Sequence, residues 1–529
     1  MTPHTDHPAS DLTEQAAPRV RPATFAVVLL ASVTTLVTLA WVLDVDLIDD
    51  SYIFLRYSRN IAEGHGAVFN VSERVEGFSS PLWTFMLGIA GVAMRDFETL
   101  AYALGICCGG GAITLLLHGL YKTGRVGGWD LAVLGVGLAS SPVIFFWSAS
   151  GMETALFLLL VTASLMSILE DRRTTALSIR TGVLLILATL TRPEGVLLAA
   201  YAGAFFICER RSIRVLIGYA IVMAVMLMLR YLYYGAWVPN TYHAKVTFEL
   251  ARRLNDGSYY ILPAVRANIL LLAAVFMVLV VAWKQRVHRQ VPIAFLGGWI
   301  VLWGSYVLYV GGDNFALFRF LLPTVPAWFL LLAWGWSAIR LRLAPVTKCA
   351  CLVVLVAAFG VSNVLTYRQQ APGYYGDVKL ARSWAKVGQW LEQNTPPDTV
   401  VATIVPGAFG YFSRRPLIDM LGLTDRTVGL YGDVFRGAVH GHARYNTDYV
   451  FERKPDIVLY HSSGRFTEPV YASPERIPVR TGYALFDFVT DPRCLERYAY
   501  TSVGLEDGTL IEMQTRHTPP AGPVAWTDH

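Results

Sequence analysis

Two adjacent carboxylates, Asp49 and Asp50, closely follow the first apolar stretch of the chain, residues 23–43. That stretch is long enough to cross a bilayer, which takes about 20 residues, so the pair is expected at a membrane surface. Neighbouring carboxylates repel each other, which raises one pKa or recruits a cation. Either outcome suits a general base or a metal ligand. The alternative is that the pair only solvates the end of a membrane helix, where charged residues are common.

The rest of this first loop, residues 44–80, places acids, bases and aromatic rings close together among glycines. Arg56, His65 and Glu76 are candidates for polar contacts with a ligand, and Trp83, just after the loop, is a candidate for stacking on a ring of that ligand. This dense mixture favours a binding site over a loop that is merely solvated.

The order of the motifs in this loop resembles that of a known family. The matching motifs are Asp49-Asp50, Arg56-Tyr57, Asn60, residues 63–66 (Glu-Gly-His-Gly), Phe69-Asn70 and residues 75–83. They are similar to the first extracytoplasmic loop of the GT-C glycosyltransferases related to the terminal β-1,2-arabinofuranosyltransferase of actinobacterial cell walls. Proteobacterial relatives, some described by roles in pilin glycosylation or flagellar motor control, share the motif set. The resemblance implies transfer of a sugar from a polyprenyl-phosphate donor, with decaprenyl-phosphoryl-arabinofuranose as the implied donor.

The composition is that of a polytopic membrane protein. Of the 529 residues, 54% are hydrophobic and only 16% are charged, and the mean hydropathy is +0.44, which is far more apolar than a soluble protein of this length. The formal net charge of +5 lies mostly in short links between apolar runs. No polybasic tract indicates a nucleic acid as a partner. The six cysteines follow no disulfide or zinc spacing.

The apolar runs between residues 23 and 366 predict an α-helical membrane domain with roughly 11–13 segments, and the resemblance implies that this domain is of the GT-C type. Residues 1–22 are predicted to be a disordered cytoplasmic tail. Links rich in Lys and Arg are expected on the cytoplasmic side of a bacterial inner membrane, and the motif-like polar clusters then fall together on the outer face. This topology requires that one run between Asp50 and Glu153 does not cross fully, and residues 81–94 form the shortest candidate.

Residues 367–529 are predicted to form an extracytoplasmic α/β domain, whose size of about 150 residues is sufficient for a core of its own. Residues 381–393 have helical spacing, and residues 399–405, 456–460, 483–488 and 497–503 have the pattern of short strands. Residues 405–425 are expected to form a strand, a glycine turn and a second strand that face the site from above.

Charged residues at the ends of apolar runs are the next candidates. Arg192 and Glu194 flank Pro193 between two half-length runs. Charges at membrane depth usually mark a site or a cavity, whereas the alternative is an external turn with a local ion pair. Glu153 opens an apolar run, where a carboxylate also suits a helix N-terminus. In the family that the loop resembles, this acidic position faces the active-site cavity.

Two further clusters on the expected outer face match motifs of the same family. Residues 237–245 supply Trp237, Asn240, Tyr242, His243 and Lys245. An ammonium group suits a phosphate, and an imidazole suits a proton or a metal. In the second cluster, Asp313 follows two glycines, and Arg319 can form a two-point contact with a phosphate. The alternative for the second cluster is an ion pair that closes the loop.

From these residues and the resemblance we predict a site with named roles. Asp50 is the expected general base, with Asp49 as its partner. The expected phosphate ligands are Arg192, Lys245 and Arg319. The expected sugar or acceptor contacts are Glu153, Glu194, Arg56, His65, Glu76, Trp83, Trp237, Asn240, Tyr242 and Asp313. If a divalent metal ion takes part, its possible ligands are Asp49, Asp50 and His243.

Two other classes of function fit part of the pattern. A transporter or flippase of lipid-linked sugars also has a charged cavity among membrane helices, but it requires polar residues on both faces of the bilayer. A non-catalytic assembly factor of the envelope or the flagellar motor would use the C-terminal domain to bind protein. The acceptor, whether a glycan or a protein, is not specified by the sequence.

Overall fold

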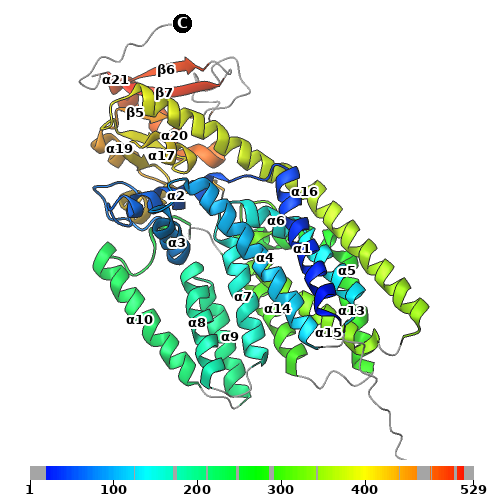
Figure 1. Cartoon of the computed structure of the whole chain (residues 1–529). Helices are drawn as coiled ribbons and strands as arrows, with labels where there is room; N and C mark the ends of the chain where they lie inside the picture. Colours follow the sequence, from blue (N-terminus) through cyan, green and yellow to red (C-terminus); the bar gives the residue numbers. More distant parts are fainter. Residues whose placement is uncertain are drawn as a thin grey trace, which may run out of the picture.

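The computed structural model describes residues 20–123, 126–170, 175–209, 213–245, 250–284, 291–340, 343–439, 441–460, 477, 479–505 and 509–517. Most of the predicted N-terminal tail lies outside these residues. Two parts are visible in Figure 1: a bundle of helices below and a smaller domain with a β-sheet above.

The bundle is built from helices of very different length. Its helices are α1 (Pro22–Val42), α4 (Phe97–Thr123), α5 (Gly128–Ala139), α6 (Pro142–Ala149), α7 (Thr154–Glu170), α8 (Thr175–Thr191), α9 (Gly195–Cys208), α10 (Arg214–Tyr234), α13 (Ile269–Lys284), α14 (Val291–Val310) and α15 (Val325–Arg340). Within the described residues, six helices are long and apolar enough to cross a membrane, or up to eight if each of two bent helix pairs counts as one span. The number of full-length spans is therefore below the predicted number of segments, because several apolar runs form short helices.

One of the short helices is α3 (Pro81–Gly91). Its 11 residues extend about 16 Å at 1.5 Å per residue, roughly half the thickness of the hydrocarbon core. This length agrees with the prediction that residues 81–94 do not cross fully. The break between α5 and α6 bends the pair by 55°, and Pro142 at the first position of α6 explains why the helix cannot simply continue.

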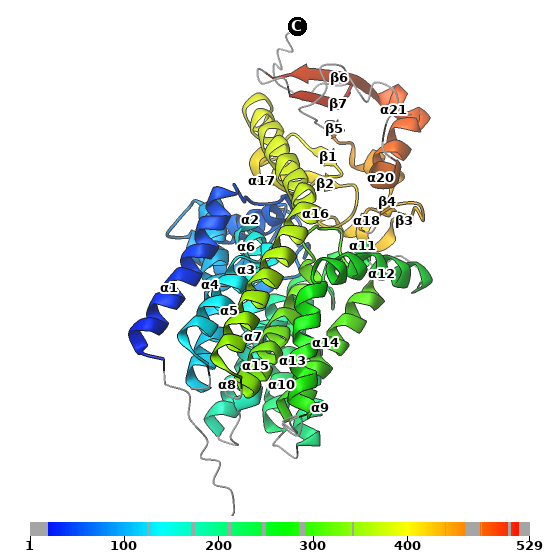
Figure 2. The ribbon, with the colours of Figure 1, turned by 90° about the vertical axis from the view of Figure 1, so that its right-hand side faces the viewer.

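Short helices lie between the bundle and the upper domain. They are α2 (Asp49–Ala62), α11 (Asn240–Lys245), α12 (Leu250–Ala267) and the 3-10 helix η2 (Arg319–Thr324). In Figure 2, α12 lies across the upper end of the bundle, beneath the C-terminal domain.

Helix α16 (Pro345–Asn394) connects the bundle to the upper domain. Its 50 residues extend about 75 Å, and Figure 1 shows it running from the lower end of the bundle into the C-terminal domain. The boundary that we predicted between residues 366 and 367 lies inside this helix. The two parts therefore share one continuous element.

The C-terminal domain contains the predicted small sheet. Its strands are β1 (Val401–Thr403), β2 (Leu417–Asp419), β5 (Ile457–Leu459), β6 (Tyr498–Gly504) and β7 (Leu510–Arg516), in the order β2-β1-β5-β7-β6. Strand β1 is parallel to β2 and β5, whereas β7 is antiparallel to β5 and β6. The remaining elements are α17 (Ala408–Ser413), α18 (Arg426–Tyr431), the pair β3 (Asp433–Val434) and β4 (Arg444–Tyr445), α19 (Thr447–Arg453), α20 (Val479–Thr490) and α21 (Pro492–Arg497).

Two details of this domain differ from the prediction. Residues 483–488 belong to helix α20 rather than to a strand, because Ala484, Leu485, Phe488 and Val489 pack into the core with helical spacing. Residues 405–425 contain helix α17 before strand β2, so Gly407 precedes a helix and Gly410 lies inside it, where we predicted a turn between two strands. The strands predicted near 399–405, 456–460 and 497–503 are confirmed as β1, β5 and β6.

Two buried arginines of α2 attach the first loop to the C-terminal domain. Arg56 donates hydrogen bonds to the carbonyl oxygens of Phe69 (2.9 Å), Gly410 (2.7 Å) and Arg415 (2.9 Å). Arg59 donates to the carbonyl oxygen of Tyr411 (2.9 Å). Burial lowers the pKa of Arg56 to about 9, so the guanidinium stays protonated at neutral pH. These bonds fix the position of α2, and hence of Asp49 and Asp50, relative to α17.

Replacing Arg56 by leucine is expected to lower the free energy of unfolding by at least about 3 kcal/mol, because hydrogen bonds to a charged group contribute about 1.5–3 kcal/mol each and buried carbonyls lose their donor. Thermal unfolding of the purified protein in detergent measures the change. Arg414→Leu is the matched control, since the Arg414 side chain is 57% exposed and 3.3 Å from Glu392, and exposed pairs contribute roughly 0–1 kcal/mol. Equal melting temperatures for the two variants would contradict the assigned attachment.

Candidate active site

A cavity of about 1350 Å³ lies where the bundle helices meet the C-terminal domain. Its lining comes from α2, α3 and α11, from the ends of α8 and α14, from the start of α9, from most of the length of α10, from α12 and α16, and from the loops around residues 405 and 422. The predicted site residues that line it are Asp49, Asp50, Glu76, Glu153, Arg192, Glu194, Trp237, Tyr242, Lys245, Asp313 and Arg319. Residues far apart in the sequence are thus brought to one space.

The first turn of α2 presents the two carboxylates to this cavity. Asp49 accepts a hydrogen bond from the backbone N–H of Ala408 (2.8 Å), so the C-terminal domain contacts one member of the pair directly. A Cβ atom added at Gly407 would collide with the Asp49 carboxylate, which explains why glycine is needed there. Asp50 makes no hydrogen bond or ion pair with any described residue. Its carboxylate is therefore available to a ligand.

Asp49 and Asp50 differ in their proton affinity. Burial raises the pKa of Asp49 to about 7, and the negative charges of Asp50 and Asp377 act in the same direction. The N–H of Ala408 lowers this pKa but does not cancel the effect of burial. Asp49 therefore changes its protonation state near neutral pH, next to the available carboxylate of Asp50.

This pKa leads to a prediction for the pH dependence of any reaction that uses the carboxylate pair as a base. As the pH rises through about 7, Asp49 loses its proton, and its negative charge then favours the transfer of a proton from an acceptor hydroxyl to the carboxylates of the cavity. The turnover rate of the wild type is thus expected to rise through this range. Asp49→Asn removes that ionisation, so the corresponding step in a pH–rate profile between pH 5.5 and 8.5 should disappear. The same step in both proteins would show that another group titrates.

The floor of the cavity is a network of ion pairs. Arg192 contacts Glu153 (2.6 Å) and Glu194 (2.9 Å), and Arg319 donates two bonds to Asp313 (2.7 and 3.1 Å). Both guanidinium charges are therefore already neutralised by carboxylates. Oxygen Oε2 of Glu153 and of Glu194 is buried without a hydrogen-bond partner within the described residues. These two oxygens are suited to accept hydrogen bonds from a polar ligand.

The glycines before Asp313 allow this network to form. Gly311 and Gly312 have φ values of +93° and +78°, which favour glycine. A Cβ atom at Gly312 would lie 2.5 Å from Cγ of Tyr260. The turn therefore packs closely on α12 and directs Asp313 towards Arg319.

Two cations at the cavity have no carboxylate partner among the described residues. Lys245, at the end of α11, lines the cavity and takes part in no ion pair there. Arg253 of α12 lies 4.7 Å above the ring of Tyr309, and its buried Nε has no hydrogen-bond partner. By contrast, Arg230 is 2.7 Å from Glu76, so the charge of Glu76 is compensated. Lys245 and Arg253 are the described cations best placed to bind an added anion.

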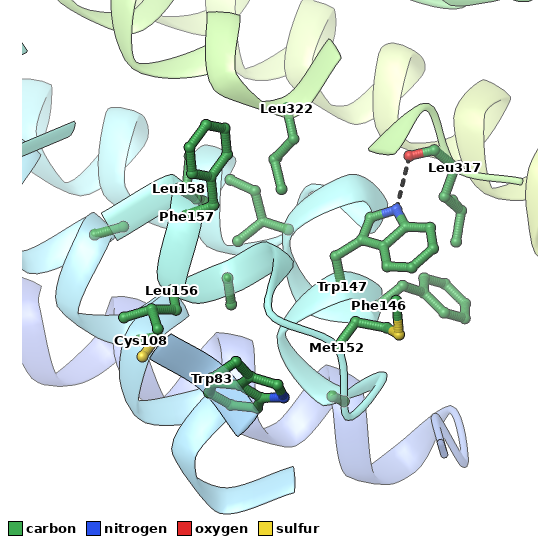
Figure 3. Close-up of a cluster of buried hydrophobic side chains, with 14 of the residues drawn as sticks. Trp83, Cys108, Phe146, Trp147, Met152, Leu156, Phe157, Leu158, Leu317 and Leu322 are labelled. Carbon is green, nitrogen blue, oxygen red and sulfur yellow. Dashed lines mark hydrogen bonds between the residues drawn. The ribbon is translucent and has the colours of Figure 1, made fainter. Parts of the chain in front are cut away.

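The structure corrects the predicted role of Trp83. Its side chain is completely buried, and its Nε1 donates to the carbonyl oxygen of Gly151 (3.1 Å). Figure 3 shows the ring inside the hydrophobic core, near Cys108 and Leu156, in the same cluster as the Trp147 side chain that donates to Leu317. A ring in this position supports the loop from below and cannot stack on a sugar.

Three other predicted contacts also lie away from the cavity lining. Arg56 uses its donors on backbone carbonyls, as described above. The amide of Asn240 is buried and donates to the carbonyl oxygens of Gly422 (2.7 Å) and Asp425 (2.8 Å), which attaches α11 to the C-terminal domain. His65 is exposed, and its nearest acidic group is Glu63 at 3.8 Å. These residues hold or flank the site, and the geometry does not support direct contact with a sugar.

The predicted metal ligands do not come together. Among the residues that the structure describes, no group of three or more His, Cys, Asp or Glu side chains is arranged to hold a metal ion. His243 is not part of the cavity lining, and burial together with the charges of Arg444 and Arg426 lowers its pKa. The set Asp49, Asp50 and His243 therefore does not fit a metal in this conformation.

Several lining residues were missed from the sequence. Asp377 of α16 lies near Asp50 and Asp313. The one sequence feature that could have indicated its place is that it follows Tyr374, a buried residue of the same helix, by three positions, which puts both on a similar side of the helix. Arg230 and Arg253 were missed because each lies on a helix whose orientation is set by packing. Tyr306 and Tyr309 end the apolar helix α14, where aromatic rings are common in any membrane protein.

Comparisons with known proteins agree with this architecture. A family model described as a domain of unknown function, DUF8728, matches residues 366–504. The terminal β-(1→2)-arabinofuranosyltransferase of Mycobacterium tuberculosis is 30% identical over 220 residues, which cover 37% of this chain and 34% of that protein. The match thus spans about a third of the curated relative.

Two solved structures share the arrangement of nearly the whole chain. The crystal structure of ArnT from Cupriavidus metallidurans bound to undecaprenyl phosphate has a TM-score of 0.59 at 13% identity, covering 93% of this chain and 98% of that one. The oligosaccharyltransferase AglB from Archaeoglobus fulgidus, in complex with an inhibitory peptide and a dolichol-phosphate, has a TM-score of 0.54 at 12% identity, covering 94% and 75%. The chain therefore has the GT-C fold of these membrane glycosyltransferases, and its sequence resembles the terminal arabinofuranosyltransferase.

Proposed function

We propose that the protein is a membrane glycosyltransferase that transfers a sugar from a polyprenyl-phosphate donor to a glycan or protein acceptor. The observation that carries this proposal is the cavity of about 1350 Å³, which holds an available carboxylate, Asp50, and two cations without carboxylate partners, Lys245 and Arg253. The reaction needs both kinds of group in one space. The structures of ArnT and AglB, which share the fold, contain undecaprenyl phosphate and dolichol-phosphate, and this supports a lipid phosphate as the leaving group.

The proposed mechanism assigns the proton to Asp50. Its carboxylate accepts the proton of the acceptor hydroxyl while the acceptor oxygen forms a bond to the anomeric carbon of the sugar. The bond between that carbon and the phosphate oxygen breaks, and the polyprenyl phosphate leaves with the electron pair. Lys245 and Arg253 stabilise the negative charge that develops on the phosphate. Asp49, which lies next to Asp50, adds its own negative charge to the site once it has lost its proton.

The floor network provides the proposed sugar contacts. The buried oxygens of Glu153 and Glu194 that lack donors are suited to accept hydrogen bonds from ring hydroxyls, because unmet hydrogen bonds of buried polar groups are costly. Arg192 and Arg319 then hold these carboxylates and Asp313 in place, rather than binding the phosphate themselves. Exposed rings of Trp237 and Tyr242 at the cavity are candidates for stacking on the acceptor.

We infer D-arabinofuranose as the transferred sugar, with decaprenyl-phosphoryl-arabinofuranose as the donor. This choice rests on the sequence similarity to the arabinofuranosyltransferase and on the motifs of the first loop. We place the protein in the bacterial inner membrane, with the cavity and the C-terminal domain on the extracytoplasmic side.

The distribution of polar residues favours transfer over transport. The charged side chains of the cavity, among them Asp50, Arg230 and Lys245, lie at the end of the bundle next to the C-terminal domain, whereas Arg180 and Arg214 lie near the starts of α8 and α10 and do not line the cavity. A transporter needs charged or polar lining on both sides of the membrane, and the charged part of the described lining gathers at one end.

The test is sugar transfer by the purified full-length protein in proteoliposomes. Radiolabelled polyprenyl-phosphoryl arabinofuranose is compared with a polyprenyl-phosphoryl hexose, each with an arabinan oligosaccharide acceptor and, separately, an extract of envelope glycans. We expect transfer from the arabinose donor and release of polyprenyl phosphate. Transfer from the hexose donor alone would keep the reaction class and overturn the sugar. Absence of transfer from every donor would favour the transporter or the assembly factor.

A further inference from the structure

We propose that α12 is an interfacial helix whose exposed apolar face, formed by Leu250, Leu254, Leu262 and Val265, lies in the outer surface of the lipid bilayer. These four side chains are 48%, 39%, 47% and 38% exposed. At 100° per residue they fall within about 120° of one another around the helix axis. They therefore form one continuous face that no described part of the chain covers.

The other faces of α12 are already occupied by protein. Gly257, Ala264 and Ala267 are buried, and a Cβ atom at Gly257 would lie 2.5 Å from the carbonyl oxygen of Leu308 in α14. Arg252, roughly 140° around the helix from the apolar face, donates a hydrogen bond to the carbonyl oxygen of Ala438 (2.7 Å) in the C-terminal domain. One side of α12 thus packs on the bundle, a second side holds the C-terminal domain, and the apolar side is left open.

The depth of α12 follows from its neighbours. Its contact with α14 is at Leu308, two residues before that helix ends at Val310. Exposed aromatic rings lie at the same end of the bundle: Tyr309 is 51% exposed, and Trp237, just after α10, is 53% exposed. Trp and Tyr are enriched where membrane helices leave the hydrocarbon core. These rings indicate that α12 lies at the level of the lipid headgroups.

The orientation of α12 supports the same conclusion. It is bent by 75° from α13, which runs along the bundle in Figure 2. If α13 follows the membrane normal, α12 lies close to the membrane plane. A helix with an apolar face and polar or cationic flanks in that plane has the properties of an interfacial helix.

Lipid is the occupant that these observations favour over a second copy or a protein partner. Exposed Ile269 and Leu270, at the start of α13, extend the apolar surface from α12 into the adjoining apolar helix. On another side of α12, Arg252 is already hydrogen-bonded to the C-terminal domain. A consequence concerns Arg253, which lies on the same helix and lines the cavity. With α12 in the interface, this guanidinium is held at the depth of lipid phosphates. The inference concerns membrane contact alone and holds whatever reaction the protein catalyses.

The experiment uses full-length protein in liposomes after replacement of its six native cysteines. Single variants Leu254→Cys, Leu262→Cys and Val265→Cys carry a nitroxide label on the apolar face. Asp398→Cys and Glu452→Cys, at exposed positions of the C-terminal domain, are the water-facing controls. Collision of each label with oxygen, which concentrates in lipid, and with a water-soluble nickel chelate is measured by electron paramagnetic resonance.

We expect a several-fold higher ratio of oxygen to chelate collisions at the three apolar positions than at the two controls. Equal chelate access at both sets of positions would place the face in water and overturn the proposal. Immobile labels on the apolar face that meet neither oxygen nor chelate would show that protein covers it, which also overturns the proposal. Oligomeric state measured on the same samples then separates a second copy from another partner.

Discussion

Replacement of Asp50 by asparagine is expected to lower the turnover of sugar transfer by about 10²- to 10⁴-fold, the usual contribution of a positioned general base. Asparagine has nearly the same shape but cannot accept the proton of the acceptor hydroxyl. Since the Asp50 carboxylate makes no hydrogen bond or ion pair with a described residue, the substitution leaves the surrounding contacts intact. The loss should therefore appear in the chemical step and not in folding.

Initial rates in proteoliposomes at matched protein amounts, with polyprenyl-phosphoryl arabinofuranose as donor, measure this effect. Asp44→Asn is the control, because the Asp44 side chain is 78% exposed and pairs with Arg382 outside the cavity. It should keep nearly full activity. Activity retained by Asp50→Asn would move the base to Asp49 or Glu153, two of the other carboxylates at the cavity.

The sequence predicts best the groups that adjoin a clear break in hydrophobicity. Asp49 and Asp50 stand directly after the first span, and Lys245 lies in a polar segment between two spans. In such places the chain itself puts the side chain at the membrane surface, and all three line the cavity. The small sheet domain was predicted for a similar reason, because its more polar composition and short strand patterns differ sharply from the apolar runs before it.

The errors arise where distant residues decide the role of a side chain. Arg56 looks like a ligand for a polar substrate, but it is bound to the carbonyl oxygen of Gly410, 354 positions away. Trp83 was interpreted as a stacking ring, but Gly151 accepts its only polar hydrogen. Local sequence gives the chemical type of these side chains and does not specify the direction in which tertiary packing points them.

The same argument explains the residues that were missed. Arg253 stands beside Arg252, and nothing in the sequence distinguishes them. Packing of α12 turns Arg252 to the C-terminal domain and Arg253 to the cavity. Conversely, Arg192 and Arg319 looked like free cations, and the structure pairs them with acids from segments up to 39 positions away. Assigning a phosphate ligand thus requires knowing which charges are already neutralised.

Substituting the two cations that lack carboxylate partners is the second change with a large expected effect. Lys245→Met and Arg253→Met should each lower kcat/KM for the lipid donor by roughly 10- to 150-fold, because a charge-assisted hydrogen bond contributes about 1.5–3 kcal/mol and 1.4 kcal/mol corresponds to tenfold. Inhibition by free undecaprenyl phosphate, which carries the leaving group without the sugar, should weaken in the same variants. A purely structural role would not change that inhibition.

Lys379→Met serves as the control, since Lys379 is exposed on α16 and does not line the cavity. The double variant should lose less than the product of the two single effects if both cations bind the same phosphate, because residues that share a partner are not additive. Unchanged kinetics in both single variants, together with a large loss in Arg192→Met, would place the phosphate on the floor network. In that case Arg192 must separate from Glu153 and Glu194 when the donor binds. The ion pairs of the cavity without donor would then not show which cation binds the phosphate.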